Sequence, residues 1–109
     1  MEDKIKFSDW QKFDFRVGEI LKVDDHPNAD KLYVLVVDIG EKKLQLVAGI
    51  KKHYNKEYLI GKKVIVFVNL EEAMIRGVKS QGMLLAAQKD ENVFFLTPEK
   101  NIDNGAKIR

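Results

Sequence analysis

Five short runs of β-branched and apolar residues, separated by turn-forming residues, constrain the fold of this chain more than any other feature of its sequence. They cover Phe15 to Val23, Leu32 to Val37, Lys43 to Val47, Val64 to Val68 and Met83 to Ala87. Runs of this length bounded by Gly, Pro, Asn and Asp are typical of strands. Because 109 residues supply one hydrophobic core and not two, the sequence predicts a single all-β domain over residues 1–109.

The first three runs differ in their apolar patterns. Phe15 and Val17 share one face of the first strand, and Gly18 interrupts it, so we expect a bulge there that bends the strand. Residues 32–37 are continuously apolar, which indicates a buried strand. Residues 43–47 alternate in polarity, which indicates a half-exposed strand that turns back on the second one. These three strands should form a meander.

Two segments have helical character. Ser8 and Gln11 have the spacing of a capping box, which predicts a short helix from Ser8 to Phe13. Trp10 and Phe13 would then pack on the domain as a lid. His53 to Leu59 is the one mid-chain stretch with a helix-like composition.

The order of these elements points to a known architecture. Five strands, with one short helix between the third and the fourth, are the order of an OB-fold, a partly open five-stranded Greek-key barrel. Residues 76–82 are rich in turn formers, and residues 92–96 predict a further short strand. Residues 96–109 would form a C-terminal extension.

Composition excludes several classes of function. The chain has 45% hydrophobic and 33% charged residues and no apolar window of membrane length, so we expect a cytoplasmic protein without a membrane segment. It has no cysteine, which removes disulfides, thiolate metal sites and cysteine nucleophiles. His26 and His53 are far apart, and we interpret them as isolated surface residues. We therefore expect no metal, no cofactor and no catalytic activity.

The charge is unevenly distributed, although its sum is only +2. Residues 42–63 contain seven lysines and one acid, Glu57, whereas four aspartates lie between residues 24 and 38. Lysines at loop edges usually keep a small domain soluble, and charge counting alone favours that interpretation. A nucleic-acid partner needs support from specific motifs.

Such motifs are present. They are Asp14-Phe15-Arg16-Val17-Gly18-Glu19-Ile20, His26-Pro27-Asn28-Ala29-Asp30-Lys31-Leu32-Tyr33, Val37-Asp38-Ile39-Gly40, Val47-Ala48-Gly49-Ile50, Asn69-Leu70 and the stretch from Gly77 to Ala87. In this order and spacing they resemble the tRNA-binding domain family, from about Phe13 to the C-terminus. One departure is Glu72, where the family usually has proline, and it puts the path of residues 70–74 in doubt.

The resemblance implies an OB-fold homodimer that binds the outside of the L-shaped tRNA without reading an anticodon. The family includes the C-terminal domain of methionyl-tRNA synthetases, free-standing tRNA-binding proteins and endothelial monocyte-activating polypeptide II. This chain resembles a free-standing member or the β-subunit-like partner of a methionyl-tRNA synthetase. By resemblance, the C-terminal extension with Phe94, Phe95 and Leu96 would contribute to the dimer interface.

Candidate RNA-binding residues follow from chemistry and from the expected binding loops of an OB-fold. A protein that binds folded RNA by shape needs cations at phosphate spacing and small or hydroxyl residues that allow close approach. The candidates are Asn28, Lys31, Lys51, Lys52, Arg76, Lys79, Ser80 and Met83. Among them Arg76 and Lys79 have no packing role in a soluble domain, whereas Met83 belongs either to the core or to the RNA-contacting edge.

Other residues of these motifs have structural interpretations. Pro27 and Asp30 build a turn, and Asp14 and Arg16 pair with each other or with the backbone. Two alternative functions also remain open. One is a dimeric chaperone or export-related protein on the same fold. The other is an assembly module that docks a synthetase and holds tRNA only incidentally.

Overall fold

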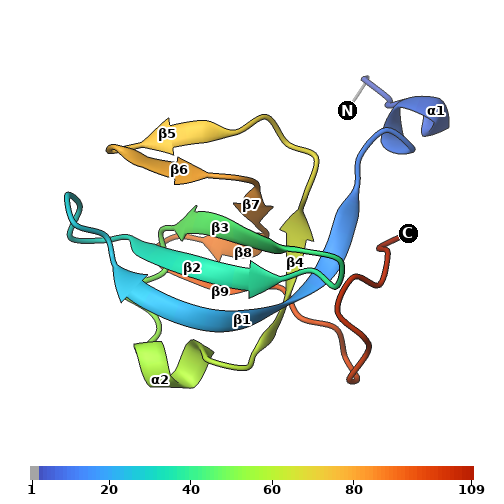
Figure 1. Cartoon of the computed structure of the whole chain (residues 1–109). Coiled ribbons are helices and arrows are strands. Elements are labelled where there is room, and N and C mark those ends of the chain that lie inside the picture. Colours follow the sequence, from blue (N-terminus) through green and yellow to red (C-terminus); the bar gives the residue numbers. More distant parts are fainter. Residues whose placement is uncertain (1–2) are drawn as a thin grey trace.

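A computed structural model describes residues 3–109, and in these residues it contains two short helices and nine strands (Figure 1). The helices are α1 (Phe7–Trp10) and α2 (Lys56–Leu59). The strands are β1 (Phe15–Asp25), β2 (Tyr33–Asp38), β3 (Lys43–Ala48), β4 (Lys63–Phe67), β5 (Ala73–Ile75), β6 (Val78–Ser80), β7 (Met83–Leu84), β8 (Ala86–Lys89) and β9 (Asn92–Phe95). The expected all-β class is confirmed.

Five of the strands form one antiparallel sheet in the order β3-β2-β1-β4-β7. The sheet curls until its two edge strands approach each other. There the Gln81 backbone N–H donates to the Gln45 carbonyl at 2.8 Å, and the Val47 N–H donates to the Ser80 hydroxyl at 3.0 Å. These bonds nearly close the barrel, and α2 lies between β3 and β4, so the OB-type order of elements is confirmed.

The barrel interior is filled from alternate positions of its strands. Ile20, Leu35 and Leu46 are fully buried at its centre. Residues 33–38 alternate between buried and half-buried positions, so the predicted strand is fully buried on one face only. The sheet has one face on the core and one toward solvent, and β-branched residues such as Val34 and Val36 occupy the outer face.

β1 is irregular, but not at Gly18, where the sequence predicts a bulge. Its register with β2 shifts between Ile20 and Lys22, which places the irregularity at Leu21. Gly18 lies instead in regular pairing, where a Cβ atom would stand 2.5 Å from the Val37 Cγ1 atom. Glycine at this position allows two strands to pack closely, and it does not make a bulge.

The N-terminal helix is present without the predicted cap. α1 begins at Phe7 with Lys6 at the N-cap, and no side chain caps it, so the capping-box prediction is wrong. The packing prediction is confirmed, because Trp10 and Phe13 join an aromatic cluster with Phe15 and Phe67. The ring centroids are 5.5 Å apart for Trp10 and Phe15 and 5.4 Å apart for Phe13 and Phe67.

Three expected elements have different bounds. The mid-chain helix is limited to Lys56–Leu59. The expected strand 83–87 divides at Leu85, since β7 pairs with β4 and β8 pairs with β9. The segment 76–82 is not only a turn. It contains β6, which pairs with β5 in a hairpin that the sequence did not predict.

The C-terminal residues return to β1 and pair with it. Val17 donates its N–H to the Ala106 carbonyl, and its own carbonyl accepts from Gly105. Ile108 donates to Phe15, and the Arg16 guanidinium donates to the Gly105 carbonyl. This segment therefore pairs with the first part of β1, which β2 does not reach, and is not a free extension. In Figure 1 it ends on the same side of the molecule as α1.

Candidate nucleic-acid interface

Three segments meet at the end of the barrel opposite α1, at the left of Figure 1. They are the loop 26–32, the segment 49–52 and the β5–β6 hairpin. The pairing of Tyr33 with Ala48 brings the first two together, because the loop precedes one strand and the segment follows the other. The His26 N–H donates to the Leu32 carbonyl at 3.2 Å and closes the loop.

The hairpin presents Arg76 at its tip. Ile75 pairs with Val78, and the two residues between them, Arg76 and Gly77, have positive φ angles of 53° and 90°. Two consecutive positive φ angles are typical of a type I′ turn, which matches the twist of a two-residue hairpin. Arginine is unusual at the first of these positions, which explains why the sequence did not indicate the hairpin.

The loop and the hairpin hold each other through Asn28 and Arg76. The Asn28 side-chain amide donates to the Arg76 carbonyl at 3.0 Å, and the Arg76 guanidinium donates to the Asn28 carbonyl at 3.2 Å. Two residues predicted to bind RNA thus lie in contact. The Asn28 side chain has a structural partner, whereas most of the Arg76 guanidinium faces solvent.

His26 lies beneath this contact and corrects the sequence interpretation. Expected at the surface, its side chain is only 5% exposed. Its Nδ1 atom accepts from the Asn28 N–H at 2.9 Å, and its Nε2 atom lies 2.9 Å from the Ile75 carbonyl oxygen. Because a backbone N–H only donates and a carbonyl only accepts, the ring is neutral with its proton on Nε2.

Ser80 is also a structural residue of this region. It is 3% exposed, and its hydroxyl donates to the Gly82 carbonyl at 3.0 Å while it accepts from Val47. Gln45 and Gln81 continue the network, since the Gln45 amide donates to the Lys79 carbonyl at 2.8 Å and the Gln81 side chain accepts from the Gln45 N–H. The hairpin is therefore anchored on β3, and neither glutamine was singled out from the sequence.

The predicted cations differ in their pairing. Within residues 3–109, Lys31, Lys52 and Arg76 have no acidic partner within 4.0 Å. Lys79 lies 3.7 Å from a Glu72 oxygen, across the hairpin. Lys51 lies 3.1 Å from an Asp25 oxygen.

Asp25 is shared between two lysines. Its second oxygen is 3.1 Å from the Lys56 Nζ atom. Hydrogen bonds from Lys56 and then Lys51 lower the pKa of Asp25, and the same bond to Asp25 raises the pKa of Lys56. This aspartate keeps part of the lysine cluster neutralised, which the lysine count of the sequence did not reveal.

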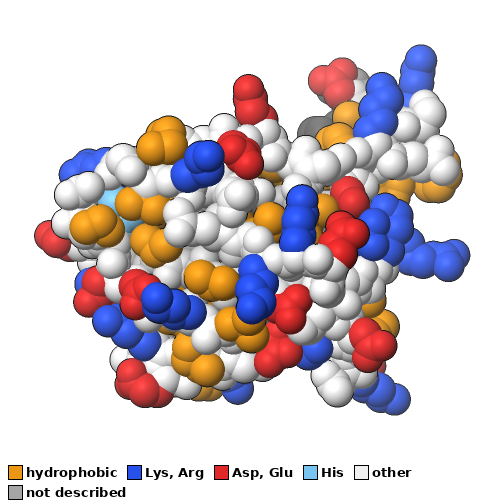
Figure 2. Space-filling view, in the orientation of Figure 1, with side chains coloured by type: hydrophobic (Ala, Val, Ile, Leu, Met, Phe, Trp, Pro, Cys, Tyr) orange, Lys and Arg blue, Asp and Glu red, His pale blue; other side chains and the backbone are white. Residues whose placement is uncertain are grey.

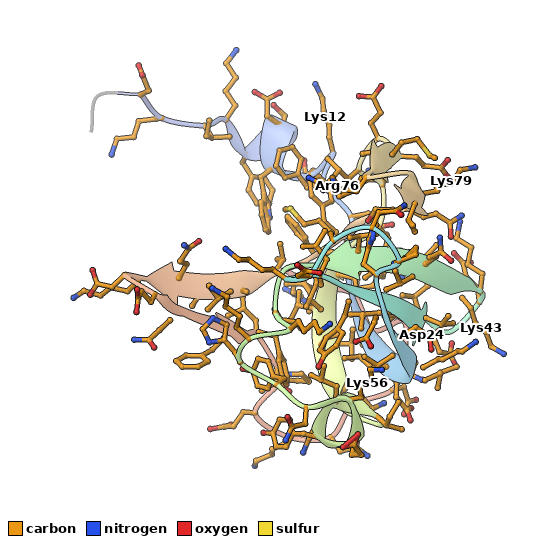
Figure 3. All side chains as sticks on the ribbon, turned by 90° about the vertical axis from the view of Figure 1, so that its left-hand side faces the viewer. Lys12, Asp24, Lys43, Lys56, Arg76 and Lys79 are labelled. Carbon is orange, nitrogen blue, oxygen red and sulfur yellow. The ribbon has the colours of Figure 1, made fainter. Side chains whose placement is uncertain are left out.

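We call Lys31, Lys51, Lys52, Arg76 and Lys79 the basic rim. Figure 3 looks onto this end of the barrel and shows Arg76 and Lys79 on the hairpin above, with Asp24 and Lys56 lower down. Figure 2 shows cationic and acidic side chains interspersed over the adjoining face, with apolar ones between them. Met83 is 44% exposed, which places it at the surface and not in the core. The rim is a local positive feature on a surface of mixed charge.

Other kinds of site find little support among the described residues. In residues 3–109 no group of three or more His, Asp or Glu side chains is arranged to hold a metal ion. The same residues contain no helix that is long and apolar enough to cross a membrane. Asp14 and Arg16 form an ion pair, 2.6 Å from Oδ1 to Nε, as the sequence suggested.

Cations on the strand 1–2 loop and on the late hairpin of an OB-type barrel are typical of the class of nucleic-acid-binding OB domains. Comparison with known sequences gives the particular family. A sequence model described as "Putative tRNA binding domain" matches residues 15–107. The chain belongs to this tRNA-binding domain family.

Individual relatives agree with this assignment. The methionine–tRNA ligase of Pyrococcus horikoshii is 55% identical over 105 residues, which cover 96% of this chain and 14% of the ligase. Among solved structures, a methionyl-tRNA-synthetase-related protein from Pyrococcus horikoshii superimposes with a TM-score of 0.91 at 31% identity, covering 98% of this chain and 99% of that one. The chaperone CsaA of Bacillus anthracis gives a TM-score of 0.89 at 30% identity and covers 98% and 100%.

Proposed function

We propose that this domain binds folded tRNA by its shape and backbone charge, without reading a sequence, and delivers tRNA to a methionyl-tRNA synthetase or retains it there. It would act as a free-standing protein or as a β-subunit-like partner of the enzyme. The basic rim carries this proposal, because three separate segments of a tRNA-binding family fold present it at one end of the barrel. The domain would work in the cytoplasm and catalyse no step itself.

The rim residues have different roles in the proposal. Lys31, Lys52 and Arg76 contact phosphates directly, because among residues 3–109 no acid within 4.0 Å competes for them. Lys51 and Lys79 exchange their carboxylate partners for phosphate when RNA binds. Asn28 and Ser80 hold the backbone in place, and Met83 offers an exposed thioether beside the hairpin.

A synthetase partner would gain affinity from the domain without any new contact to the enzyme's catalytic site. A tethered or docked tRNA-binding domain raises the effective concentration of tRNA near the enzyme. The chain spans 14% of the length of the Pyrococcus horikoshii ligase. This proportion is consistent with a module added to a larger catalytic protein.

A titration with folded tRNA and with an unstructured RNA of equal length, each at two salt concentrations, tests the proposal. If about four to six phosphates are neutralised, the logarithm of the association constant should fall against the logarithm of salt concentration with a slope of about −3 to −5. Folded tRNA should bind more tightly than the unstructured RNA. Equal binding of both RNAs, or a flat salt response, contradicts it.

Self-association is part of the proposal. Phe94 in β9 and Leu96 just after it are 51% and 41% exposed, and Ile5 and Phe7 near the N-terminus are 76% and 71% exposed. Large apolar side chains exposed together are typical of interfaces. Sedimentation of Phe94→Ser with Leu96→Ser should give a monomer where the unaltered chain gives a dimer, and an unchanged mass contradicts this interface.

Point substitutions are better suited to this test than truncation. Residues 105–108 pair with β1, so deletion from Leu96 would remove hydrogen bonds that hold the barrel edge. A truncated chain that failed to dimerise would therefore report unfolding as well as loss of an interface. The substituted side chains at 94 and 96 leave these bonds in place.

A chaperone function is the second candidate, and the fold similarity to CsaA together with the exposed apolar side chains favours it. In that case the protein should suppress aggregation of an unfolded client at stoichiometric amounts. It should also bind folded and unstructured RNA equally weakly. The same titration therefore separates the two functions.

A further inference from the structure

His26 joins the loop 26–32 to the β5–β6 hairpin from inside the domain. Both ring nitrogens are used, one for the Asn28 N–H and the other for the Ile75 carbonyl, each at 2.9 Å. Neither bond goes to the barrel core. The buried ring therefore satisfies both of its nitrogens with the backbones of two segments that are far apart in the sequence.

The two partners of the ring lie on either side of Arg76, the exposed cation in the turn of the hairpin. Ile75 directly precedes Arg76, so its bond fixes the backbone just before the turn. Asn28 in turn bonds the Arg76 carbonyl and accepts from its guanidinium. The position of Arg76 thus depends on Ile75 and Asn28, and both of these residues are hydrogen-bonded to the His26 ring.

Such an arrangement lowers the cost of binding. A long side chain on a mobile hairpin loses conformational freedom when it contacts phosphate, and a hairpin already fixed in place loses less. The positive φ angle of Arg76 also indicates that the hairpin is fixed before RNA binds. This backbone conformation costs free energy and persists only when its surroundings enforce it.

We propose that His26 is a positioning residue for RNA binding, which fixes the loop and the hairpin as one unit and thereby places Arg76 against the RNA backbone. This inference rests on the proposed tRNA-binding function. It assigns His26 an effect on affinity that acts through Arg76 and not through contact with RNA. The required state of the ring is the neutral form with the proton on Nε2.

Two substitutions of His26 test the two hydrogen bonds of its ring separately. An asparagine side chain places an acceptor near the position of Nδ1, so His26→Asn retains the loop bond and loses the hairpin bond. A glutamine side chain places a donor near the position of Nε2, so His26→Gln retains the hairpin bond and loses the loop bond. His53→Gln is the matched control, since the His53 ring packs on Phe94 at 6.0 Å between centroids and takes no part in the contact between the loop and the hairpin.

Binding of folded tRNA to these variants and to Arg76→Ala gives a double-mutant comparison. Losing one phosphate contact should raise Kd roughly tenfold near 0.1 M salt and reduce the salt slope by about 1. Both His26 variants should approach these changes, and His26→Gln combined with Arg76→Ala should bind within about twofold of Arg76→Ala alone. If a His26 variant were only partly unfolded, the fraction of protein able to bind RNA would fall, and the dependence of Kd on salt concentration would stay the same.

Two outcomes overturn the proposal. In the first, the His26 variants bind folded tRNA with a Kd within twofold of the unaltered protein. In the second, the increase in Kd of the double variant is the product of the increases of the two single variants. If one of the two His26 variants does not fold, the other, combined with Arg76→Ala, provides the same comparison, because each variant removes one of the two ring bonds.

Hydrogen exchange on the RNA-free protein separates this proposal from the proposed function. In His26→Gln the amide of Asn28, and in His26→Asn the amides of the hairpin, should exchange about tenfold faster than in the unaltered chain, while β2 amides are unaffected. If the unaltered protein shows no preference for tRNA, the proposed function fails whatever the exchange rates are. If exchange in the hairpin is unchanged, the positioning role fails even where tRNA binds.

Discussion

The two ends of the barrel are stabilised by different physical interactions. At the rim end, the loop 26–32 and the β5–β6 hairpin are held by hydrogen bonds of His26, Asn28 and Ser80, and their cations face solvent. At the opposite end, Trp10 and Phe13 pack on Phe15 and Phe67, and the apolar side chain of Phe7 faces solvent. A polar framework suits contact with RNA phosphates, whereas an aromatic one suits contact with another protein surface.

The largest expected difference between the two ends is in RNA affinity. Arg76→Ala combined with Lys79→Ala removes two phosphate contacts and should raise Kd for folded tRNA about 60-fold near 0.1 M salt, with the salt slope reduced by about 2. Lys107→Ala, at the aromatic end, should change Kd less than about twofold by the same reasoning.

Circular dichroism and urea unfolding control for folding in these variants. Both cations of the hairpin are exposed, so the free energy of unfolding should change little. An effect of Lys107→Ala equal to that of the hairpin variant would show that RNA contacts both ends, and the division between them would be wrong.

The next largest expected effect is on the free energy of unfolding. It is measured by making the same change, serine to alanine, at each end of the barrel. Ser80→Ala leaves the Val47 N–H without its acceptor inside the barrel seam, which should lower the free energy of unfolding by about 2 kcal/mol. Ser8→Ala should cost less than about 0.5 kcal/mol, because Ser8 is exposed and caps no helix. Urea unfolding of both variants measures the difference, and equal costs would show that the seam bond contributes nothing.

The smallest expected effect concerns the ion pair of Asp14 near the aromatic end. The hydrogen bond from Arg16 lowers the pKa of Asp14, against some opposition from burial. A carboxyl group whose pKa is depressed by folding stabilises the protein above its unfolded pKa, and this contribution is lost as the pH falls through the folded value. For this partly exposed pair we expect about 0.5 to 1 kcal/mol at pH 7.

Asp14→Asn measures that contribution. The variant should be less stable than the unaltered chain at neutral pH, and the two stabilities should converge in acid below the unfolded pKa of about 3.9. Asp9→Asn, which removes an exposed pair with Lys12, is the control and should show a smaller difference. A stability difference that grows toward acid pH would have the wrong sign for this mechanism.

The sequence predicted the barrel better than the rim, for physical reasons. Runs of β-branched residues specify strands locally, so four strands were found close to their observed bounds. The β5–β6 hairpin was missed because its turn has Arg76 where Asn or Asp is usual. The capping box failed because Ser8 lies inside the first turn of α1 and not at its cap.

The roles of the site residues depended on contacts that no local pattern contains. His26 looks like a surface residue beside Pro27 and becomes buried only because the hairpin, about 50 positions later in the chain, covers it. Ser80 was chosen for its hydroxyl, and that hydroxyl is used within the barrel seam. The tRNA-binding family, in contrast, was identified from motifs whose order does not require knowledge of these contacts.

The return of residues 105–108 along β1 has a consequence for how the domain can be combined with others. Both the N-terminal helix and the C-terminus lie at one pole, and the rim lies at the other (Figure 1). A second domain joined through either end would start on the far side from the basic rim. An enzyme could therefore be fused at either end of the domain without covering the rim, which is the surface proposed to bind RNA.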